Sequence, residues 1–155
     1  MKICILGKSG ELSCDLINCL VDYEVNILDR HILDITKFDI AYDILYNISP
    51  DIIILLTEYA DMLKCENNPD LAYKINVEGT KNIIQISKKI NCTLFVLSTN
   101  HVFDGSKGYS YNEYDKPNPI NQYGKTKLAT ELLLHQYLKK YYIIRTGALF
   151  GSTGT

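Results

Sequence analysis

Lys-Ile-Cys-Ile-Leu-Gly-Lys-Ser-Gly, residues 2–10, is an apolar run that ends in a turn containing two glycines. A short continuous apolar run is typical of a strand that is buried on both faces of a parallel sheet. In residues 10–21, apolar side chains then recur at the spacing of a helix. The stretch therefore predicts a strand, a glycine turn and a helix, which is the first unit of an α/β fold.

The same alternation continues along the chain. Further strands are expected at residues 24–28, 52–56, 93–97 and 142–145, and further helices at residues 37–48, 69–90 and 121–140. Asn68 and Asn121 are candidate N-caps of the last two helices, and residues 104–120 are expected to form a loop. The 155 residues have the size of one domain. Alternating units of this kind imply a doubly wound, Rossmann-like parallel sheet with helices on both faces.

The composition argues against several classes of protein. A formal net charge of −2, with Arg30 and Arg145 as the only arginines, gives no reason to expect nucleic acid or a membrane as partner. No stretch approaches about 18 consecutive apolar residues, so no spanning helix is expected. The five cysteines are odd in number and lack a Cys-x-x-Cys motif, which indicates neither a disulfide framework nor a zinc site. We expect a cytoplasmic protein with reduced cysteines and no metal cluster.

Polar and glycine residues follow the predicted strands. Because parallel α/β sheets bind ligands beyond the carboxyl ends of their strands, these residues should line one crevice. They are Gly7–Gly10, Asp29, Leu56–Glu58, Ser98–Thr99 and Thr146–Gly147.

The turn after the first strand is a candidate phosphate loop. Gly7 permits the tight turn, Gly10 lets the backbone approach a pyrophosphate, and Ser9 can donate a hydroxyl hydrogen bond. Ser13 stands where a third glycine would serve helix–strand packing, and it is small enough for that position. The alternative is a simple turn between a strand and a helix.

The end of the second strand leaves the choice of cofactor open. Asp29 could accept hydrogen bonds from an adenosine ribose, which favours NAD, or could be an ordinary turn residue. Arg30 could instead meet a 2′-phosphate, which favours NADP. Asp34, Ile35 and Thr36 could contact adenine, or could cap the following helix.

Tyr123 and Lys127 form the candidate catalytic pair. Four residues apart in a predicted helix, they share one face, so the lysine cation should lower the tyrosine pKa from its usual value of about 10. The tyrosine could then exchange a proton with an alcohol or carbonyl near neutral pH. Thr99 could hydrogen-bond the same carbonyl oxygen. The alternative is a surface pair on an amphipathic helix.

The chain resembles the extended short-chain dehydrogenase/reductase family, and most of all its dTDP-4-dehydrorhamnose reductase branch. The resemblance covers nearly the whole chain, with its motifs in the family's order and spacing. The stretches that carry it are Gly-Lys-Ser-Gly (7–10), Pro-Asp-Ile-Ile-Ile (50–54), Lys-Ile-Asn-Val-Glu-Gly-Thr (74–80), Leu-Ser-Thr-Asn-His-Val-Phe-Asp-Gly (97–105), Pro-Asn-Pro-Ile-Asn-Gln-Tyr-Gly-Lys-Thr-Lys-Leu (117–128) and Arg-Thr-Gly (145–147).

The resemblance implies NADPH- or NADH-dependent reduction of the C4 keto group of a nucleotide-linked 4-keto-6-deoxy sugar. It implies that Tyr123 protonates the alkoxide, that Lys127 bonds the nicotinamide ribose and tunes Tyr123, and that Thr99 orients the carbonyl. Asn76 would support the helix and sheet behind the site. The cofactor would contact Gly7, Ser9, Gly10, Glu11, Leu12, Asp29, Arg30, Asp34, Ile35, Leu56, Thr57, Tyr123 and Lys127, and the substrate would contact Thr99, His101 and Tyr123. A Mg²⁺ ion could accompany the substrate.

Several positions depart from the family pattern. Leu55–Glu58 replaces an Asn-Ala-Ala stretch of small residues, and Glu58 adds a negative charge near the dinucleotide. Asn100-His101 replaces an Asp-Tyr pair, of which the tyrosine commonly holds substrate. His101 could serve as an alternative acid or hydrogen-bond donor, or could be a polar loop residue. Met62-Leu63 and Ala148 are further departures. They fit a related sugar substrate, or a relative that binds cofactor without efficient catalysis.

Family members continue for more than a hundred further residues. We therefore expect residues 1–155 to be an NAD(P)-binding domain truncated after the fifth strand, without the carboxyl-terminal substrate domain. A homodimer or a carboxyl-terminal partner polypeptide could complete it. The alternatives to a reductase are a non-catalytic dinucleotide-binding subunit, like the one that regulates methionine adenosyltransferase, and a nucleotide-sugar epimerase.

Overall fold

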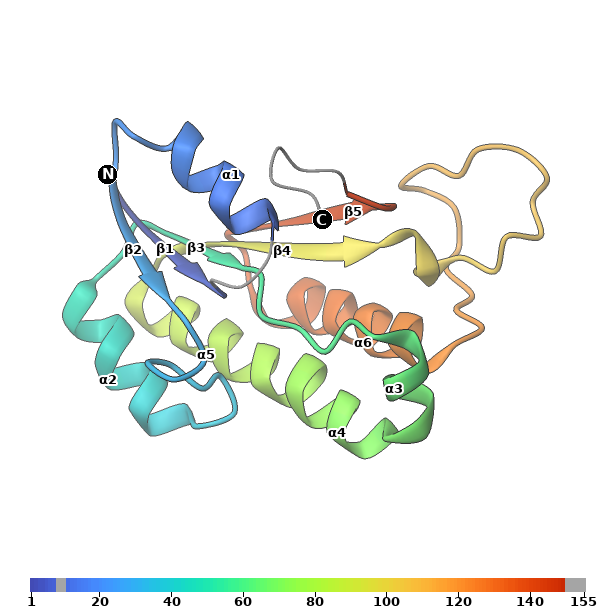
Figure 1. The fold of residues 1–155 in the computed structure, drawn as a ribbon, viewed down its shortest axis with the longest axis horizontal. Coiled ribbons are helices and arrows are strands. Elements are labelled where there is room, and N and C mark those ends of the chain that lie inside the picture. Colours follow the sequence, from blue (N-terminus) through green and yellow to red (C-terminus); the bar gives the residue numbers. More distant parts are fainter. Residues whose placement is uncertain (8–10, 150–155) are drawn as a thin grey trace.

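Five parallel strands form one sheet at the centre of the molecule (Figure 1). The computed structural model describes residues 1–7 and 11–149. The order of the strands in the sheet is β2-β1-β3-β4-β5, so the chain reverses its direction of travel at β1, as in a doubly wound sheet. The strands are β1 (Lys2–Leu6), β2 (Glu24–Leu28), β3 (Ile52–Leu55), β4 (Thr93–Thr99) and β5 (Tyr141–Thr146).

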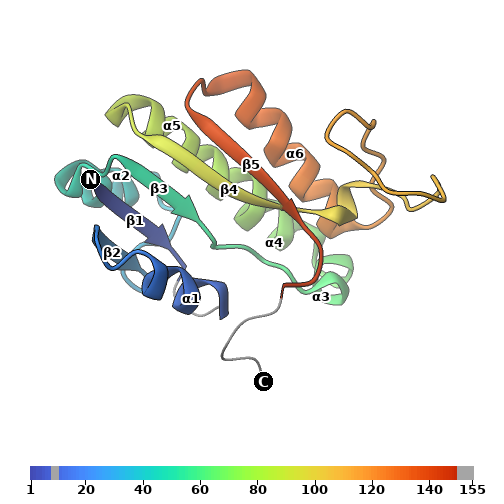
Figure 2. The ribbon, with the colours of Figure 1, turned by 90° about the horizontal axis from the view of Figure 1, so that it is seen from above.

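Helices cover both faces of the sheet, as the sequence predicts. In Figures 1 and 2, α1 lies on one face, and α2, α5 and α6 lie on the other. The helical segments are α1 (Glu11–Cys19), α2 (Phe38–Ile48), α3 (Met62–Asn67), α4 (Pro69–Tyr73), the π-helical turn η1 (Lys74–Gly79), α5 (Thr80–Ile90), the 3₁₀ turn η2 (Asn100–Val102) and α6 (Gln122–Tyr137). No helix in the described parts of the chain is long and apolar enough to cross a membrane.

The region between β3 and α5 differs most from expectation. The helix expected over residues 69–90 is divided into α4, η1 and α5, and α3 was not expected at all. Asp61 starts α3 by accepting a hydrogen bond from the Lys64 amide at 2.9 Å. A helix of six residues is too short to show a periodic pattern. Asn68 occupies the predicted N-cap position, directly before Pro69 at the start of α4, but its side chain makes no capping hydrogen bond.

The core lies between the sheet and the helices α2, α5 and α6. Ile83, Ile84 and Ile86 of α5 are fully buried against strand residues such as Ile53 and Leu94. Burial of each such side chain contributes about 1.5–3 kcal/mol. These contacts fix the positions of the strand ends, where the predicted site residues lie.

The opposite face of the sheet is less covered at β5. Tyr142 and Ile144 are 59% and 45% exposed there, and Tyr142 stacks on Phe95 of β4 with ring centroids 4.6 Å apart. No described helix covers this part of the sheet (Figure 2).

Candidate active site

The carboxyl ends of β1 and β3 meet at Gly7. Its φ of +116° is rarely adopted by residues with a side chain. A Cβ atom there would also lie 3.0 Å from the Thr57 amide nitrogen and 3.1 Å from the Leu56 carbonyl carbon. The close approach of two backbones therefore requires glycine. Ser9 and Gly10 lie outside the described residues, as does the side chain of Glu11, while Leu12 is half-buried in α1.

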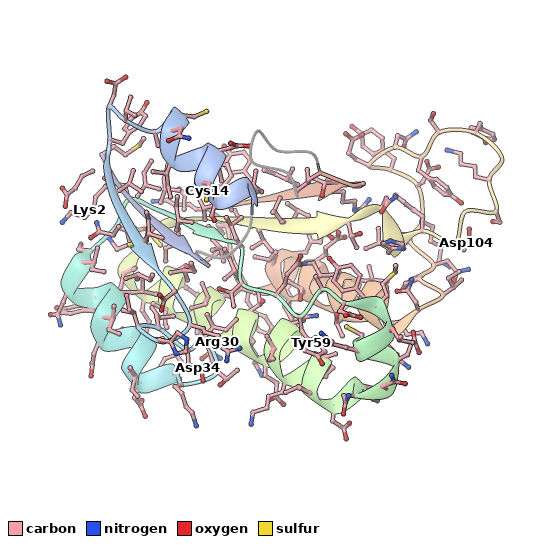
Figure 3. All side chains as sticks on the ribbon, viewed as in Figure 1. Lys2, Cys14, Arg30, Asp34, Tyr59 and Asp104 are labelled. Atoms are coloured by element: carbon pink, nitrogen blue, oxygen red, sulfur yellow. The ribbon has the colours of Figure 1, made fainter. Side chains whose placement is uncertain are left out.

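The residues predicted to contact adenosine lie beyond β2. Oδ1 of Asp29 accepts hydrogen bonds from the amides of His31 and Ile32, at 2.8 and 3.1 Å, and so closes a turn. Arg30 is exposed, and Figure 3 shows it on the same side of the molecule as Asp34.

Asp34 and Ile35 have clear structural roles. Oδ1 of Asp34 accepts hydrogen bonds from the hydroxyl and the amide of Thr36, at 2.7 and 2.9 Å. These hydrogen bonds hold the pKa of Asp34 below its usual range, and the bond from the Thr36 hydroxyl has the largest effect. Ile35 is 1% exposed, so its side chain belongs to the core. Asp34 thus orders the turn before α2 but does not cap that helix, because Lys37 occupies its N-cap position.

Three predicted catalytic residues come together at the end of β4 and the start of α6. Asn121 caps α6, as predicted, by accepting a hydrogen bond from the Gly124 amide at 2.7 Å. The cap places Tyr123 and Lys127, 8% and 5% exposed, on the buried side of the helix. Thr99 is 5% exposed and lies close enough to Tyr123 to lower its pKa.

Glu58 contacts both members of the Tyr–Lys pair. Its Oε2 accepts a hydrogen bond from the Tyr123 hydroxyl at 3.1 Å and another from Nζ of Lys127 at 2.8 Å. The pKa of Tyr123 is raised, first by burial and then by the charge and hydrogen bond of Glu58, while Thr99 opposes the rise. The expected lowering of this pKa is therefore not observed, because burial and the Glu58 carboxylate outweigh the opposing effect.

Asn76 supports the segment that carries Glu58. Its Oδ1 accepts a hydrogen bond from the Tyr59 amide at 2.7 Å, and its Nδ2 donates to the Tyr59 carbonyl at 3.1 Å. Nδ2 also donates to Oγ1 of Thr126 at 3.0 Å. The π-helical turn η1 thereby joins α6 to the segment after β3, where Figure 3 shows Tyr59. The position of Asn76 fits the supporting role that the resemblance implies.

A second buried network ties α6 to β4 and β5. Glu131 is 2% exposed; its Oε1 accepts hydrogen bonds from the Ser98 hydroxyl at 2.5 Å and from Nε of Arg145 at 2.9 Å. Its Oε2 accepts another from Nη2 of Arg145 at 2.7 Å. These hydrogen bonds raise the pKa of Arg145 above its ordinary value. Sequence reasoning missed Glu131, for which the only signal was its place one turn after Lys127.

Gly124 was also missed, although it allows α6 to approach η2. A Cβ atom at this position would lie 2.2 Å from the carbonyl oxygen of His101 and 3.0 Å from its carbonyl carbon. Real Cβ atoms essentially never lie so close to a neighbouring atom, so a side chain here would force the backbones apart. The close contact brings Tyr123, the preceding residue, against the end of β4.

We expect Gly124→Ala to destabilise the protein by about 2–3 kcal/mol, because α6 must move away from η2 to accommodate the methyl group. Urea denaturation followed by circular dichroism measures the loss. Gly147→Ala is the control, since the nearest atom to its Cβ would be Nδ2 of Asn100 at an ordinary 3.7 Å. Equal stability of the two variants would contradict the close contact.

A cavity of about 640 Å³ opens beside the cluster of Thr99, Tyr123 and Lys127. His101 lies between this cluster and the cavity: it lines the cavity, and its ring packs edge to face against that of Tyr123, with ring centroids 6.1 Å apart. The other lining residues are Asn100, Phe103, Asp104, Gly105, Ser110–Glu113, Ile120 and Arg145–Gly147. Among the described residues, no group of three or more His, Cys, Asp or Glu could hold a metal ion.

Asp104 orders the loop that forms one wall of the cavity. It accepts hydrogen bonds from the hydroxyls of Ser106 and Tyr111 and from Nδ2 of Asn118, at 2.7, 2.9 and 2.8 Å. Asp104 also accepts a hydrogen bond from the Ser106 amide, which lowers the pKa of Asp104 most. Together these hydrogen bonds hold that pKa well below its usual range. The predicted loop is therefore an ordered wall beside the predicted substrate residues.

Comparison with known proteins supports the resemblance seen in the sequence. The dTDP-4-dehydrorhamnose reductase of Aggregatibacter actinomycetemcomitans is 35% identical over 99% of this chain and 53% of its own length. The methionine adenosyltransferase 2 subunit beta of Bos taurus is 31% identical over 83% of this chain and 36% of its own length. The chain thus spans about half the length of the curated reductases it matches.

A solved structure agrees closely with the fold. The dTDP-4-dehydrorhamnose reductase of Bacillus anthracis, crystallised in complex with NADP, superimposes with a TM-score of 0.95 at 34% identity. The match covers 99% of this chain and 56% of that one. The family described as the RmlD substrate binding domain matches residues 1–155. This chain therefore belongs to the RmlD substrate binding domain family, as the resemblance to dTDP-4-dehydrorhamnose reductases implies.

Proposed function

We propose that this chain is the NAD(P)-binding domain of a reductase that acts on a nucleotide-linked 4-keto-6-deoxy sugar. The observation that carries the proposal is the meeting of Thr99, Tyr123 and Lys127 in one buried cluster. The cluster lies beside a cavity of about 640 Å³. Family membership supports this substrate class, because the relatives of this chain include dTDP-4-dehydrorhamnose reductases.

The described residues fit a dinucleotide at the ends of β1 and β3. Gly7 lies at the carboxyl end of β1 with a φ of +116° and no room for a Cβ atom, which fits the first glycine of a dinucleotide-binding turn. The cofactor would be held by residues 7–12 and by Asp29, Arg30, Leu56, Thr57 and Lys127. The exposed guanidinium of Arg30, together with the NADP in the Bacillus anthracis relative, supports NADPH over NADH.

The nicotinamide, when bound, supplies a hydride to the keto carbon. Tyr123 gives its hydroxyl proton to the resulting alkoxide, and its raised pKa keeps the phenol protonated at neutral pH. Thr99 orients the carbonyl through its hydroxyl, which accepts a hydrogen bond from the His101 amide at 3.2 Å. His101 lines the cavity and would contact the sugar. A Mg²⁺ ion accompanying the substrate stays a prediction.

A second candidate function is that of a dinucleotide-binding regulatory subunit. Glu58 occupies both Tyr123 and Lys127, which is unfavourable for proton transfer. The similarity to methionine adenosyltransferase 2 subunit beta points the same way. Such a subunit would bind the dinucleotide without consuming it.

Titration of the chain with NADPH and NADH, followed by nicotinamide fluorescence, tests both functions. We expect saturable binding, with NADPH the tighter ligand. Addition of a dTDP-linked 4-keto-6-deoxy sugar should then cause loss of absorbance at the nicotinamide band, and EDTA in a parallel assay tests for Mg²⁺. Saturable binding without consumption would favour the regulatory function. A folded chain that binds neither dinucleotide would refute both.

A further inference from the structure

Glu58 lies in the segment after β3, and its carboxylate reaches into the cluster of Thr99, Tyr123 and Lys127. One oxygen, Oε2, accepts both the Tyr123 and the Lys127 hydrogen bond. The side chain of Lys127 is only 7% exposed, and that of Glu58 is 26% exposed. In residues 1–7 and 11–149, Glu58 is the only carboxylate that forms an ion pair with Lys127.

A buried ammonium group is costly unless a counter-charge pairs with it. Glu58 supplies that charge, and Asn76 fixes its place by two hydrogen bonds to the neighbouring residue, Tyr59. Cys65 of α3 also lies near Glu58, and its pKa is raised by burial first and to a lesser extent by Asp61, Glu66 and Glu58. The carboxylate is therefore held in the cluster by its hydrogen bonds with Tyr123 and Lys127 and by the anchored backbone of Tyr59.

We propose that Glu58 is a gate on the cofactor site: it holds Lys127 and Tyr123 in a mutually neutralised arrangement that a dinucleotide must open in order to bind. The proposal rests on the proposed function, since it assigns Lys127 to the nicotinamide ribose. Glu58 is a positioning residue that acts through Lys127 and Tyr123. The free protein is thus a closed state, and the cofactor shifts the population towards an open one.

The gate predicts two changes of opposite sign on removal of the carboxylate. The free protein loses the partner of a buried cation and becomes less stable. The dinucleotide no longer has to displace Glu58, so its affinity rises. A merely structural role for Glu58 would lower both quantities together.

The experiment compares Glu58→Ala and Glu58→Gln with the unaltered chain. Each protein is titrated with NADPH by nicotinamide fluorescence and unfolded in urea without ligand. We expect the Kd of Glu58→Ala to fall about tenfold while its urea midpoint decreases. Glu58→Gln retains a hydrogen-bond acceptor, so its Kd and its urea midpoint should lie between those of the unaltered chain and those of Glu58→Ala. Glu66→Gln is the control, since Oε1 of Glu66 bonds the Gln122 amide at 2.6 Å and the amide side chain keeps that bond.

Titration of Tyr123 gives a readout that does not involve the cofactor. Tyrosine labelled with ¹³C at Cζ is observed by NMR, and the Tyr123 signal is assigned by its absence from Tyr123→Phe. Because the negative charge of Glu58 raises the Tyr123 pKa, the signal should begin to move at lower pH in Glu58→Gln than in the unaltered chain. Glu66→Gln should leave it unchanged.

The outcomes separate the gate from the proposed function. Tighter NADPH binding with lower stability and an earlier Tyr123 titration supports the gate. Binding by the unaltered chain with unchanged or weaker binding by Glu58→Ala overturns the gate and leaves the proposed function standing. Absence of NADPH and NADH binding in both proteins, with both folded, overturns the proposed function and the gate with it.

Discussion

Under the proposed function, turnover of the keto sugar should fall by about 10²–10⁴-fold when Tyr123 is replaced by Phe, because the reaction would lose its general acid. The aromatic ring packs in a small cluster with Cys65 and Ala72 and is 8% exposed. Phenylalanine keeps this packing and loses only the hydroxyl. The affinity for NADPH should therefore change by no more than about twofold, so the loss appears in kcat.

The matched control is Tyr137→Phe, which removes a hydroxyl from the exposed end of the same helix. Its turnover should equal that of the unaltered protein. The measurement is the steady-state consumption of NADPH over a range of sugar concentrations. Turnover of Tyr123→Phe within a factor of about three of the unaltered value would remove Tyr123 as the acid.

The second large effect is expected on stability, from Glu131→Ala. The change leaves the partly buried Arg145 guanidinium without its paired carboxylate and the buried Ser98 hydroxyl without its acceptor. Breaking a buried ion pair by removing one partner costs about 3–5 kcal/mol. Because Glu131 joins α6 to β4 and β5, the free energy of unfolding should fall by this amount in urea denaturation.

Two further variants isolate the cause of that loss. Glu131→Gln keeps the size and one acceptor oxygen but removes the charge, so its loss should be smaller. Glu78→Ala removes an exposed carboxylate from η1 and should change the free energy of unfolding by less than about 0.5 kcal/mol. A Glu131→Ala variant as stable as Glu78→Ala would show that the network contributes nothing to the fold.

The sheet was largely predictable because strands are local patterns. The apolar runs at residues 2–6 and 24–28 coincide with β1 and β2. The common edge was predictable as well, since parallel strands bring their carboxyl ends together. That the residues at this edge line one crevice stays a prediction, because of the described residues expected there only Thr146 and Gly147 line the cavity beside β4 and β5. The strand β4 extends two residues beyond its predicted end, to Thr99, because its pairing with β5 continues to Thr146.

The chemistry of the cluster was predictable only in part. A spacing of four residues places Lys127 beside Tyr123, but it cannot show that Glu58, 69 residues before Lys127, pairs with that lysine. The same limit concealed the contact of Gly124 with His101. Contacts between distant segments depend on the packed fold, whereas propensity and periodicity report only neighbours along the chain.

The wide turn η1 separates two helical surfaces that serve different parts of the molecule. Before it, Ala72 of α4 faces the small cluster around Tyr123. After it, Ile83 and Ile84 of α5 face the core beneath the sheet. A π-helical turn holds one residue more than an α-helical turn, and each residue of an α-helix adds about 100° of rotation. The extra residue in η1 therefore rotates the apolar face of α5 relative to that of α4. Removal of one residue from η1 would turn one of these two faces towards solvent.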